Sequence, residues 1–168
     1  MNKEIPAIPY SKKIKVDKSK IHGLGIIAKR NIKKGEIVFI IKGKEKHWQI
    51  KSEKDALYGD CWIGIKKNLW IDPKGFGRFI NHSGKPNCGI RGKLLVCAMR
   101  DIKKGEEATI DYSTTEEEPL WWMKNGIDGK IIKSIQSIPL KKYKSYLPFV
   151  PKYFQMVYNN FHNLKRRE

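Results

Sequence analysis

The chain has 168 residues, and its 35 Lys and Arg against 17 Asp and Glu give a net charge of +18. A globular chain of this length fits one domain and buries roughly 70% of its unfolded surface, so its core needs no disulfide or metal to hold it. No apolar run approaches the ~20 residues of a membrane span. The positive charge favours attraction to polyanions such as nucleic acid or an anionic membrane. Because the basic residues are spread along the whole chain, they also fit a solvated lysine-rich surface without a dedicated partner.

The N-terminal segment, MNKEIPAIPYSKK, lacks the apolar stretch of a signal peptide. The three cysteines, Cys61, Cys88 and Cys97, are an odd number without the spacing of a disulfide framework, which favours reduced thiols. These features together predict a soluble protein inside the cell. We therefore expect a cytoplasmic location.

Residues 19–38 carry a Gly-Leu-Gly step, an apolar run and a Lys-Gly turn. This order predicts a strand, a turn and a second strand. A similar turn sequence occurs 70 positions later: AKRNIKKGE begins at Ala28 and AMRDIKKGE begins at Ala98. We expect positive φ at Gly35 and Gly105, since this conformation costs glycine less than a residue with a Cβ.

Further β-like runs lie at residues 37–41, 61–65 and 69–72, and the last two flank a Lys-Lys-Asn hairpin turn. The first two thirds of the chain show little helical period. Beyond Pro139 the pattern changes, because apolar residues recur at spacings of three and four, and Pro139 and Pro151 suit the first turns of helices. The tail is therefore predicted to be a small helical cap.

Residues 78–112 read RFINHSGKPNC, then an apolar run containing LLVCAM, then RDIKKGEEATIDY. Together with the Gly-Leu-Gly segment, they resemble the SET domain, the fold of S-adenosylmethionine-dependent protein lysine methyltransferases. The resemblance implies a mainly β fold with a small α-helical C-terminal cap, in which several short sheets form a β-clip-like arrangement and the C-terminal segment has a knot-like threading. We expect an N-terminal extension at residues 1–13, a SET core at 14–113, and a post-SET lid with the helical cap at 114–168.

The resemblance also implies which residues form the site. Tyr112 would be the catalytic tyrosine, with its hydroxyl beside a methyl channel, and S-adenosylmethionine would be the cofactor. The cofactor-binding residues would come from the Gly-Leu-Gly loop, the Asn-His pair, the tyrosine and the lid: Gly23, Leu24, Gly25, Asn81, His82, Tyr112 and Trp121. Taken one at a time, the same residue types also fit a core aromatic, a capped turn and an ordinary glycine turn.

The chain departs from many SET proteins at their zinc site. Those proteins end the loop as NHSC and supply three cysteines after the tyrosine, whereas this loop ends at Gly84 and no cysteine follows Cys97. Because all four ligands are missing together, we expect no metal site. Large apolar side chains follow instead at Leu120, Trp121 and Trp122, either to close over an adenine or to dock the C-terminal helices.

Two isoleucines also stand where the family pattern has other residues. Ile41 stands where many relatives carry a tyrosine that lines the lysine channel, and Tyr58 is a candidate replacement. Ile110 stands where Phe or Tyr often limits the number of methyl groups, so the smaller side chain would leave room for di- or trimethylation. The acidic run at residues 116–118 follows Tyr112, and we expect it either to attract a basic substrate or to be a solvated loop.

The sequence therefore predicts a protein-lysine N-methyltransferase that transfers the methyl group of S-adenosylmethionine to a lysine of a protein substrate. The expected partner is a protein that presents a lysine, such as a basic nucleoid or chromatin protein. The charge also allows nucleic acid, and we expect a monomer without membrane contact. The alternative is a catalytically silent SET scaffold that binds basic peptide or nucleoprotein, which the missing tyrosine at Ile41 favours and the intact motifs oppose.

Overall fold

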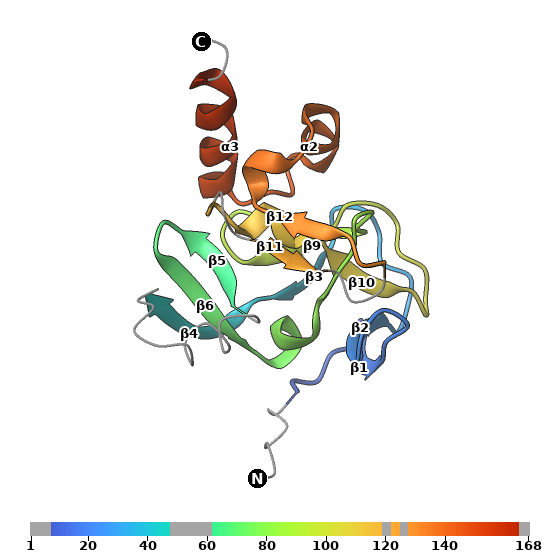
Figure 1. Cartoon of the computed structure of the whole chain (residues 1–168). Coiled ribbons are helices and arrows are strands. Elements are labelled where there is room, and N and C mark those ends of the chain that lie inside the picture. The colour runs from blue at the N-terminus through green and yellow to red at the C-terminus, as the bar shows by residue number, and fades with distance from the viewer. Residues whose placement is uncertain (1–7, 48–61, 119–121, 125–127, 165–168) are drawn as a thin grey trace.

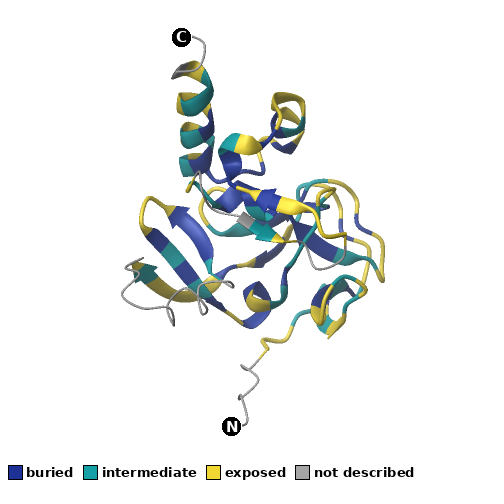
Figure 2. Cartoon of the chain, in the orientation of Figure 1, coloured by how far each residue is buried: buried dark blue, intermediate teal, exposed yellow. Residues whose placement is uncertain are grey.

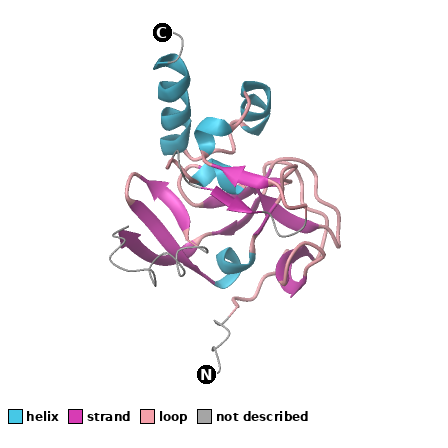
Figure 3. Cartoon of the chain, viewed as in Figure 1, coloured by secondary structure: helices cyan, strands magenta, loops and turns pink. Residues whose placement is uncertain are grey.

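The computed structural model describes residues 8–47, 62–118, 122–124 and 128–164. Within them the chain forms mostly short strands in several small sheets, followed by two C-terminal α-helices (Figures 1 and 3). This architecture confirms the predicted mainly β fold with a helical cap. The strand pairings alone do not test the knot-like threading or the domain boundaries, which stay predictions.

The described strands form four small sheets. The largest has the order β1-β2-β10-β7, two others have the orders β3-β9-β8 and β4-β6-β5, and β11 pairs with β12. The bounds are β1 (Ile14–Lys18), β2 (Leu24–Ala28), β3 (Ile37–Ile40), β4 (Lys42–His47), β5 (Ile63–Lys66), β6 (Leu69–Lys74), β7 (Asn81–His82), β8 (Cys88–Arg91), β9 (Leu95–Ala98), β10 (Glu107–Ile110), β11 (Trp122–Lys124) and β12 (Ile131–Lys133).

Helical structure is short among the strands and longer in the tail. The 3-10 turns are η2 (Gly75–Phe79), η3 (Tyr112–Thr115) and η4 (Ile135–Ser137), and the α-helices are α2 (Leu140–Tyr146) and α3 (Lys152–Leu164). The two α-helices begin directly after Pro139 and Pro151, as predicted. In the described part of the chain, no helix is long and apolar enough to cross a membrane.

Strand β4 is not predicted by the sequence, because its residues, KGKEKH, show no apolar alternation. It forms because β6 pairs with each of its residues, from Lys42 opposite Lys74 to His47 opposite Leu69. The hairpin between β5 and β6 is confirmed, and Asn68 takes a φ of 55° in its turn. Pairing with a neighbour thus decides the conformation of a strand whose own composition is nearly all polar.

The two Lys-Lys-Gly turns lie side by side and make matching contacts. Ile32 and Ile102 exchange two backbone hydrogen bonds of 2.8 Å, one in each direction. The N–H of Gly35 and that of Gly105 each donate, at 2.8 Å, to the alanine carbonyl that precedes the other turn. Their φ angles are 85° and 88°, which confirms the predicted turn conformation. The sequence echo therefore corresponds to a local two-fold arrangement that joins β2 and β3 to β9 and β10.

Two clusters of buried apolar side chains hold the molecule together (Figure 2). The larger is built by the strands and contains fully buried residues such as Ile26 and Ile110. The smaller lies in the helical cap, where the rings of Tyr143 and Tyr158 stack with centroids 3.7 Å apart. The Tyr158 hydroxyl donates to the carbonyl of Ile138 at 2.9 Å, so this buried polar group is paired.

Two glycines let the C-terminal segment lie directly on the strands. A Cβ at Gly64 in β5 would stand 2.0 Å from the carbonyl oxygen of Thr115 and 2.9 Å from the Phe154 ring. A Cβ at Gly89 in β8 would stand 2.4 Å from the carbonyl oxygen of Phe149. Because both contacts are with backbone, no side-chain rotation relieves them. The C-terminal segment is therefore packed against the strands at positions that only glycine can occupy.

We predict that Gly89→Ala destabilises the protein by about 1–3 kcal/mol, because the new methyl group overpacks the contact with the cap. Gly84→Ala is the matched control, since a Cβ there meets nothing within 4 Å and its φ is not positive. Its effect should stay within about 0.5 kcal/mol. Urea unfolding of both variants measures the difference, and equal stabilities would contradict the tight contact at Gly89.

Candidate active site

Three segments that are far apart in the sequence meet in the sheet β1-β2-β10-β7. Strand β10 pairs antiparallel with β2, where Ala108 lies opposite Ile26, and parallel with β7, where Ile110 lies opposite His82. Strand β2 begins within the Gly-Leu-Gly step, β7 is the Asn-His pair, and Tyr112 lies just beyond the end of β10. The sheet therefore brings all three predicted motifs onto adjacent strands.

The side chain of Asn81 ties the Asn-His pair to the Gly-Leu-Gly loop. Its Nδ2 lies 3.1 Å from the carbonyl oxygens of His22 and Leu24, 2.7 Å from Glu107 Oε1 and 3.2 Å from Ser19 Oγ. These four acceptors fix the orientation of the amide, because only its nitrogen can donate to them. Asn81 Oδ1 has no donor among the described residues, so it is free to accept a hydrogen bond from a ligand.

The Glu107 carboxylate organises the same loop, although the motifs do not point to it. Ser19 Oγ donates to its two oxygens at 2.8 and 2.9 Å and accepts from the backbone N–H groups of Ile21 and His22. A Cβ at Gly25 would stand 2.1 Å from Glu107 Oε1, so the carboxylate lies directly on this glycine. Glu107 thus shapes the loop from the neighbouring strand.

A comparison of the two similar turn sequences, from Ala28 and from Ala98, could have pointed to Glu107. In the first copy of the turn the corresponding position is Ile37, an apolar strand residue, whereas the second copy carries a carboxylate. A charged residue at an apolar strand position is best explained by a specific polar partner. Comparing the two copies therefore singles out Glu107 but does not predict which residues it contacts.

Asn87 is a second residue that the sequence does not identify. It is 4% exposed, its Nδ2 donates to the Glu107 carbonyl at 2.7 Å, and its Oδ1 accepts from the Thr109 N–H at 2.9 Å. The side chain therefore pairs with backbone groups of β10 as a neighbouring strand would. In the sequence Pro86-Asn87 has only the signature of a turn.

His82 accepts a hydrogen bond from the backbone of Tyr112. The distance from the Tyr112 nitrogen to His82 Nδ1 is 3.2 Å, and the two ring centroids are 5.3 Å apart. An accepting Nδ1 carries no proton, so His82 is neutral with its proton on Nε2. Burial lowers the pKa of His82 below its ordinary value, which agrees with this geometry. The 3.7 Å between Nδ1 and Asp111 Oδ1 is therefore not an ion pair.

The Tyr112 hydroxyl is held by a backbone carbonyl. It donates to the oxygen of Ile80 at 2.7 Å, and the ring packs beside the main apolar cluster. Because the hydroxyl proton is used in this bond, the oxygen can act toward other groups only as an acceptor. The geometry makes Tyr112 a fixed acceptor.

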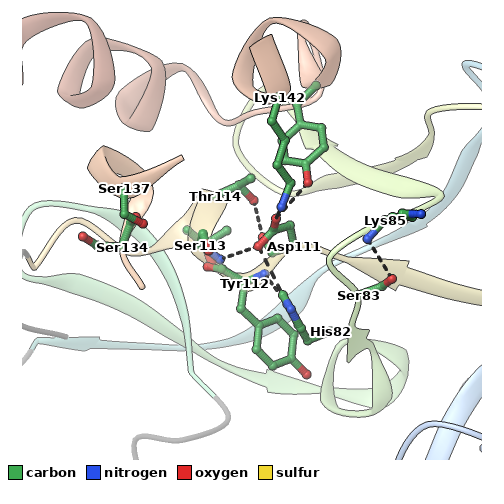
Figure 4. Close-up of polar contacts among 12 residues, drawn as sticks. His82, Ser83, Lys85, Asp111, Tyr112, Ser113, Thr114, Ser134, Ser137 and Lys142 are labelled. Carbon is green, nitrogen blue, oxygen red and sulfur yellow. Dashed lines mark hydrogen bonds and ion pairs between the residues drawn. The ribbon is translucent and has the colours of Figure 1, made fainter. Parts of the chain in front are cut away.

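Asp111 anchors the turn that carries Tyr112 (Figure 4). Its Oδ1 accepts from the Ser113 N–H at 3.1 Å, and its Oδ2 accepts from the Tyr146 hydroxyl at 2.8 Å and contacts Lys142 Nζ at 2.9 Å. The residue is 2% exposed. Burial alone would raise the pKa of Asp111, but the Lys142 charge and the bonds from Lys142 and Tyr146 hold it below its ordinary value. The carboxylate is thus a buried, fully paired charge.

The remaining predicted residues have mixed outcomes. Gly23 has a φ of 51° and open space where a Cβ would stand, and Leu24 is 45% exposed at the start of β2. Ile41 is 1% exposed in the main core, and its relation to a lysine channel stays a prediction. Trp121 and Tyr58 lie outside the described residues, so their expected roles stay predictions as well.

The acidic run after Tyr112 is only partly exposed, since Glu116 and Glu117 are half-buried, and the expected attraction of a basic substrate stays a prediction. The Glu116 carboxylate accepts from the Glu117 N–H at 3.0 Å and from the Trp70 side chain, and burial raises its pKa. Glu117 accepts from the Tyr153 hydroxyl at 2.6 Å. Glu118 is exposed. Two of the three carboxylates therefore hold the segment after η3 against Trp70 and Tyr153.

Within the residues that the structure describes, no group of three or more His, Cys, Asp or Glu could hold a metal ion. Part of the predicted lid, at residues 119–121, lies outside the described residues. The zinc-free lid therefore stays a prediction.

Comparison with protein families shows which family carries these motifs. The SET domain family model matches residues 23–113, which is more than half of the chain. The chain belongs to the SET-domain family. This membership confirms the resemblance drawn from the sequence, and the match ends just after Tyr112, before the helical cap begins.

Several curated proteins are similar to the chain. A protein named histone-lysine N-methyltransferase, H3 lysine-4 specific, from Neurospora crassa is 34% identical over 122 residues, covering 63% of this chain and 9% of the relative. The variant-silencing SET domain-containing protein of Plasmodium falciparum is 36% identical over 124 residues, covering 62% of this chain and 5% of the relative. The chain thus spans less than a tenth of the length of these two relatives.

Solved structures are similar as well, among them the crystal structure of a candidate histone methyltransferase of Plasmodium falciparum. It is 28% identical, has a TM-score of 0.47, and the match covers 61% of this chain and 95% of that one.

We predict that Glu107→Gln destabilises the protein by about 1–3 kcal/mol, because the amide nitrogen that replaces one carboxylate oxygen cannot accept from Ser19, and the remaining oxygen no longer makes charge-assisted hydrogen bonds. Glu106→Gln is the matched control, since the neighbouring glutamate forms a surface ion pair with Arg100 at 2.9 Å. Such a pair contributes about 0–1 kcal/mol. Urea unfolding measures both, and a smaller effect at position 107 than at 106 would contradict the organising role of Glu107.

Proposed function

We propose that this chain is a protein-lysine N-methyltransferase that uses S-adenosylmethionine. Membership of the SET-domain family supports the reaction, as do relatives named histone-lysine N-methyltransferases. The observation that carries the proposal is that β10 places the Gly-Leu-Gly loop, the Asn-His pair and Tyr112 together. A chance occurrence of the three motifs would not be expected to bring them to neighbouring strands.

The polar atoms left over at this site suit the amino-acid part of the cofactor. Asn81 Oδ1 is an acceptor that fits an ammonium group, and His82 Nε2–H is a donor that fits an acceptor atom of the ligand. Neither atom has a partner among the described residues. Gly23, Leu24 and Gly25 would supply backbone, because the open space at Gly23 permits close approach of a ligand. The proposed contact of Trp121 rests on the resemblance alone.

The reaction needs a neutral lysine amine aligned with the methyl group. When bound, S-adenosylmethionine supplies an electrophilic methyl group: the amine lone pair forms the N–C bond, the C–S electrons pass to sulfur, and the methylated amine loses a proton. A free lysine has a pKa near 10.4, so burial of the amine next to a positive charge would favour its neutral form.

Tyr112 would contribute by orientation. Its hydroxyl is held by the Ile80 carbonyl at 2.7 Å, so its oxygen keeps one position relative to the sheet. A fixed acceptor can align an amine N–H and stabilise positive charge that develops during transfer, which are effects of proximity and preorganisation. The protein therefore would not need a separate general base on the Tyr112 turn.

The substrate is proposed to be a protein that presents a lysine, and histones are the first class to test because the relatives carry that name. The predicted cytoplasmic location, the monomeric state and binding of nucleic acid stay predictions. A catalytically silent scaffold that binds basic peptide remains the second candidate, because Ile41 is an apolar core residue where many relatives carry a tyrosine.

Methyl transfer can be measured directly. The purified chain is incubated with S-adenosylmethionine labelled on the methyl group, with core histones and with a lysate of its own source. Label on the lysine side chains of one or more proteins is expected, found by mass spectrometry of the digested products. Cofactor binding by calorimetry without any transfer would favour the silent scaffold.

We predict that Tyr112→Phe lowers turnover by roughly 10²- to 10⁴-fold, the range typical of a positioned proton-transfer or orienting group. The ring remains, so cofactor binding measured by calorimetry should change little. Tyr10→Phe is the matched control, because Tyr10 is 82% exposed and loses the same hydroxyl away from the site. Turnover of Tyr112→Phe close to that of the control would remove Tyr112 from the catalytic role.

We predict that the activity needs no zinc, because the cysteines that hold the metal in many SET proteins are absent from this sequence. Dialysis against a chelator should leave turnover and melting temperature unchanged. Stoichiometric zinc in the active protein, found by elemental analysis, would show that the C-terminal segment binds metal through other ligands.

A further inference from the structure

The helical cap supplies two side chains to the turn that carries Tyr112. Lys142 and Tyr146 both lie on α2, and both contact Asp111 Oδ2, at 2.9 and 2.8 Å. Figure 4 shows the Lys142 side chain reaching from its helix to the Asp111 carboxylate. Helix α2 lies outside the part of the chain that the SET family model matches. This connection is therefore a feature of the cap of this chain.

Lys142 is the cation that balances the buried charge of Asp111. The carboxylate is 2% exposed, and among the described residues its other hydrogen bonds come from neutral donors, the Tyr146 hydroxyl and the Ser113 N–H. His82 lies 3.7 Å away but is neutral, since its Nδ1 accepts from the Tyr112 N–H. A buried carboxylate without a cation is unfavourable, so the position of Lys142 matters to the whole turn.

A continuous series of contacts leads from Lys142 to the Tyr112 backbone. Lys142 neutralises Asp111, Asp111 lies beside His82, and His82 accepts from the Tyr112 N–H only while its Nδ1 is unprotonated. If the charge of Lys142 is lost, the charge of Asp111 favours a proton on His82. A protonated Nδ1 repels the Tyr112 N–H, because both groups are then donors.

We propose that Lys142 is a positioning residue for the catalytic turn: its ammonium group keeps His82 as a hydrogen-bond acceptor and thereby fixes the backbone of Tyr112. The inference rests on the proposed function for its effect on turnover, but not for its effect on His82. It assigns the helical cap a part in the chemistry of the site, in addition to its part in folding.

The charged and titratable groups around His82 determine the direction of the effect. Burial lowers the pKa of His82, the charge of Lys142 on α2 lowers it further, and the charges of Asp111 after β10 and of Asp128 before β12 raise it. Removing the Lys142 charge therefore raises the pKa of His82. Asp111 keeps the bonds from Tyr146 and Ser113, which favour its ionised form, so the added proton is expected on His82.

The test follows the His82 ring and the Tyr112 amide by NMR over a pH titration, with signals assigned by comparison with His82→Asn. Lys142→Met removes the charge and the donor, whereas Lys142→Gln keeps a donor for Asp111 and remains informative if the Met variant does not fold. Lys142→Arg restores the charge. Lys141→Met is the matched control, because Lys141 is the preceding, exposed lysine on the same helix.

In Lys142→Met and Lys142→Gln we expect the pKa of His82 to rise by roughly one unit, with a shifted Tyr112 amide signal. We also expect the acidic limb of the kcat profile to move to higher pH by the same amount, so that kcat falls up to about tenfold on that limb, with KM nearly unchanged. Lys142→Arg and Lys141→Met should resemble the unsubstituted protein.

Folded Lys142→Met or Lys142→Gln protein with an unchanged His82 titration and Tyr112 amide would overturn the inference. If the unsubstituted chain transfers no methyl group to any protein, the proposed function fails, but the NMR titration still decides whether Lys142 controls His82. A fall in kcat that Lys141→Met shares would likewise count against a specific role of Lys142.

Discussion

The position of β10 between β2 and β7 is the constraint on which the site depends. This strand of four residues, Glu107–Ile110, uses both of its edges, antiparallel to β2 on one side and parallel to β7 on the other. A slip of one residue would turn every side chain of β10 to the opposite face, so its buried partners specify its register. With this register, Glu107 reaches the Gly-Leu-Gly loop at one end, and Tyr112 follows at the other end beside His82.

The helical cap extends this constraint through packing and charge. Gly64 and Gly89 let the C-terminal segment lie directly on β5 and β8, while Lys142 and Tyr146 of α2 pair with the buried Asp111. Burying the Asp111 charge gains little stability compared with apolar packing, because the carboxylate loses its hydration. The ion pair does, however, fix geometry, since the buried carboxylate is unfavourable without its partner. The cap is thus held in one place relative to the turn that begins at Tyr112.

The sequence predicted what is encoded within short segments and missed what depends on distant contacts. The turns at Gly35 and Gly105, the helices after the two prolines, and the segment around Tyr112 could be recognised because each is local. Glu107 and Asn87 acquire their roles from residues on other strands, and no spacing along the chain reveals such a partner. The surroundings of the acidic run were not predicted for the same reason, because Glu116 and Glu117 are paired with groups that the fold brings to them.

Polar atoms at the site fall into two sets: those bonded within the protein and those left for a ligand. One set is used by the protein itself, namely Asn81 Nδ2, His82 Nδ1 and the Tyr112 hydroxyl proton. The other set consists of Asn81 Oδ1 and His82 Nε2, and their directions follow because the first set is fixed. A ligand then meets groups that are already oriented, so little reorganisation is needed when charge moves. Folding of the sheet and cap supplies that order before any ligand binds, which is why residues as distant as Glu107 and Lys142 belong to the description of the site.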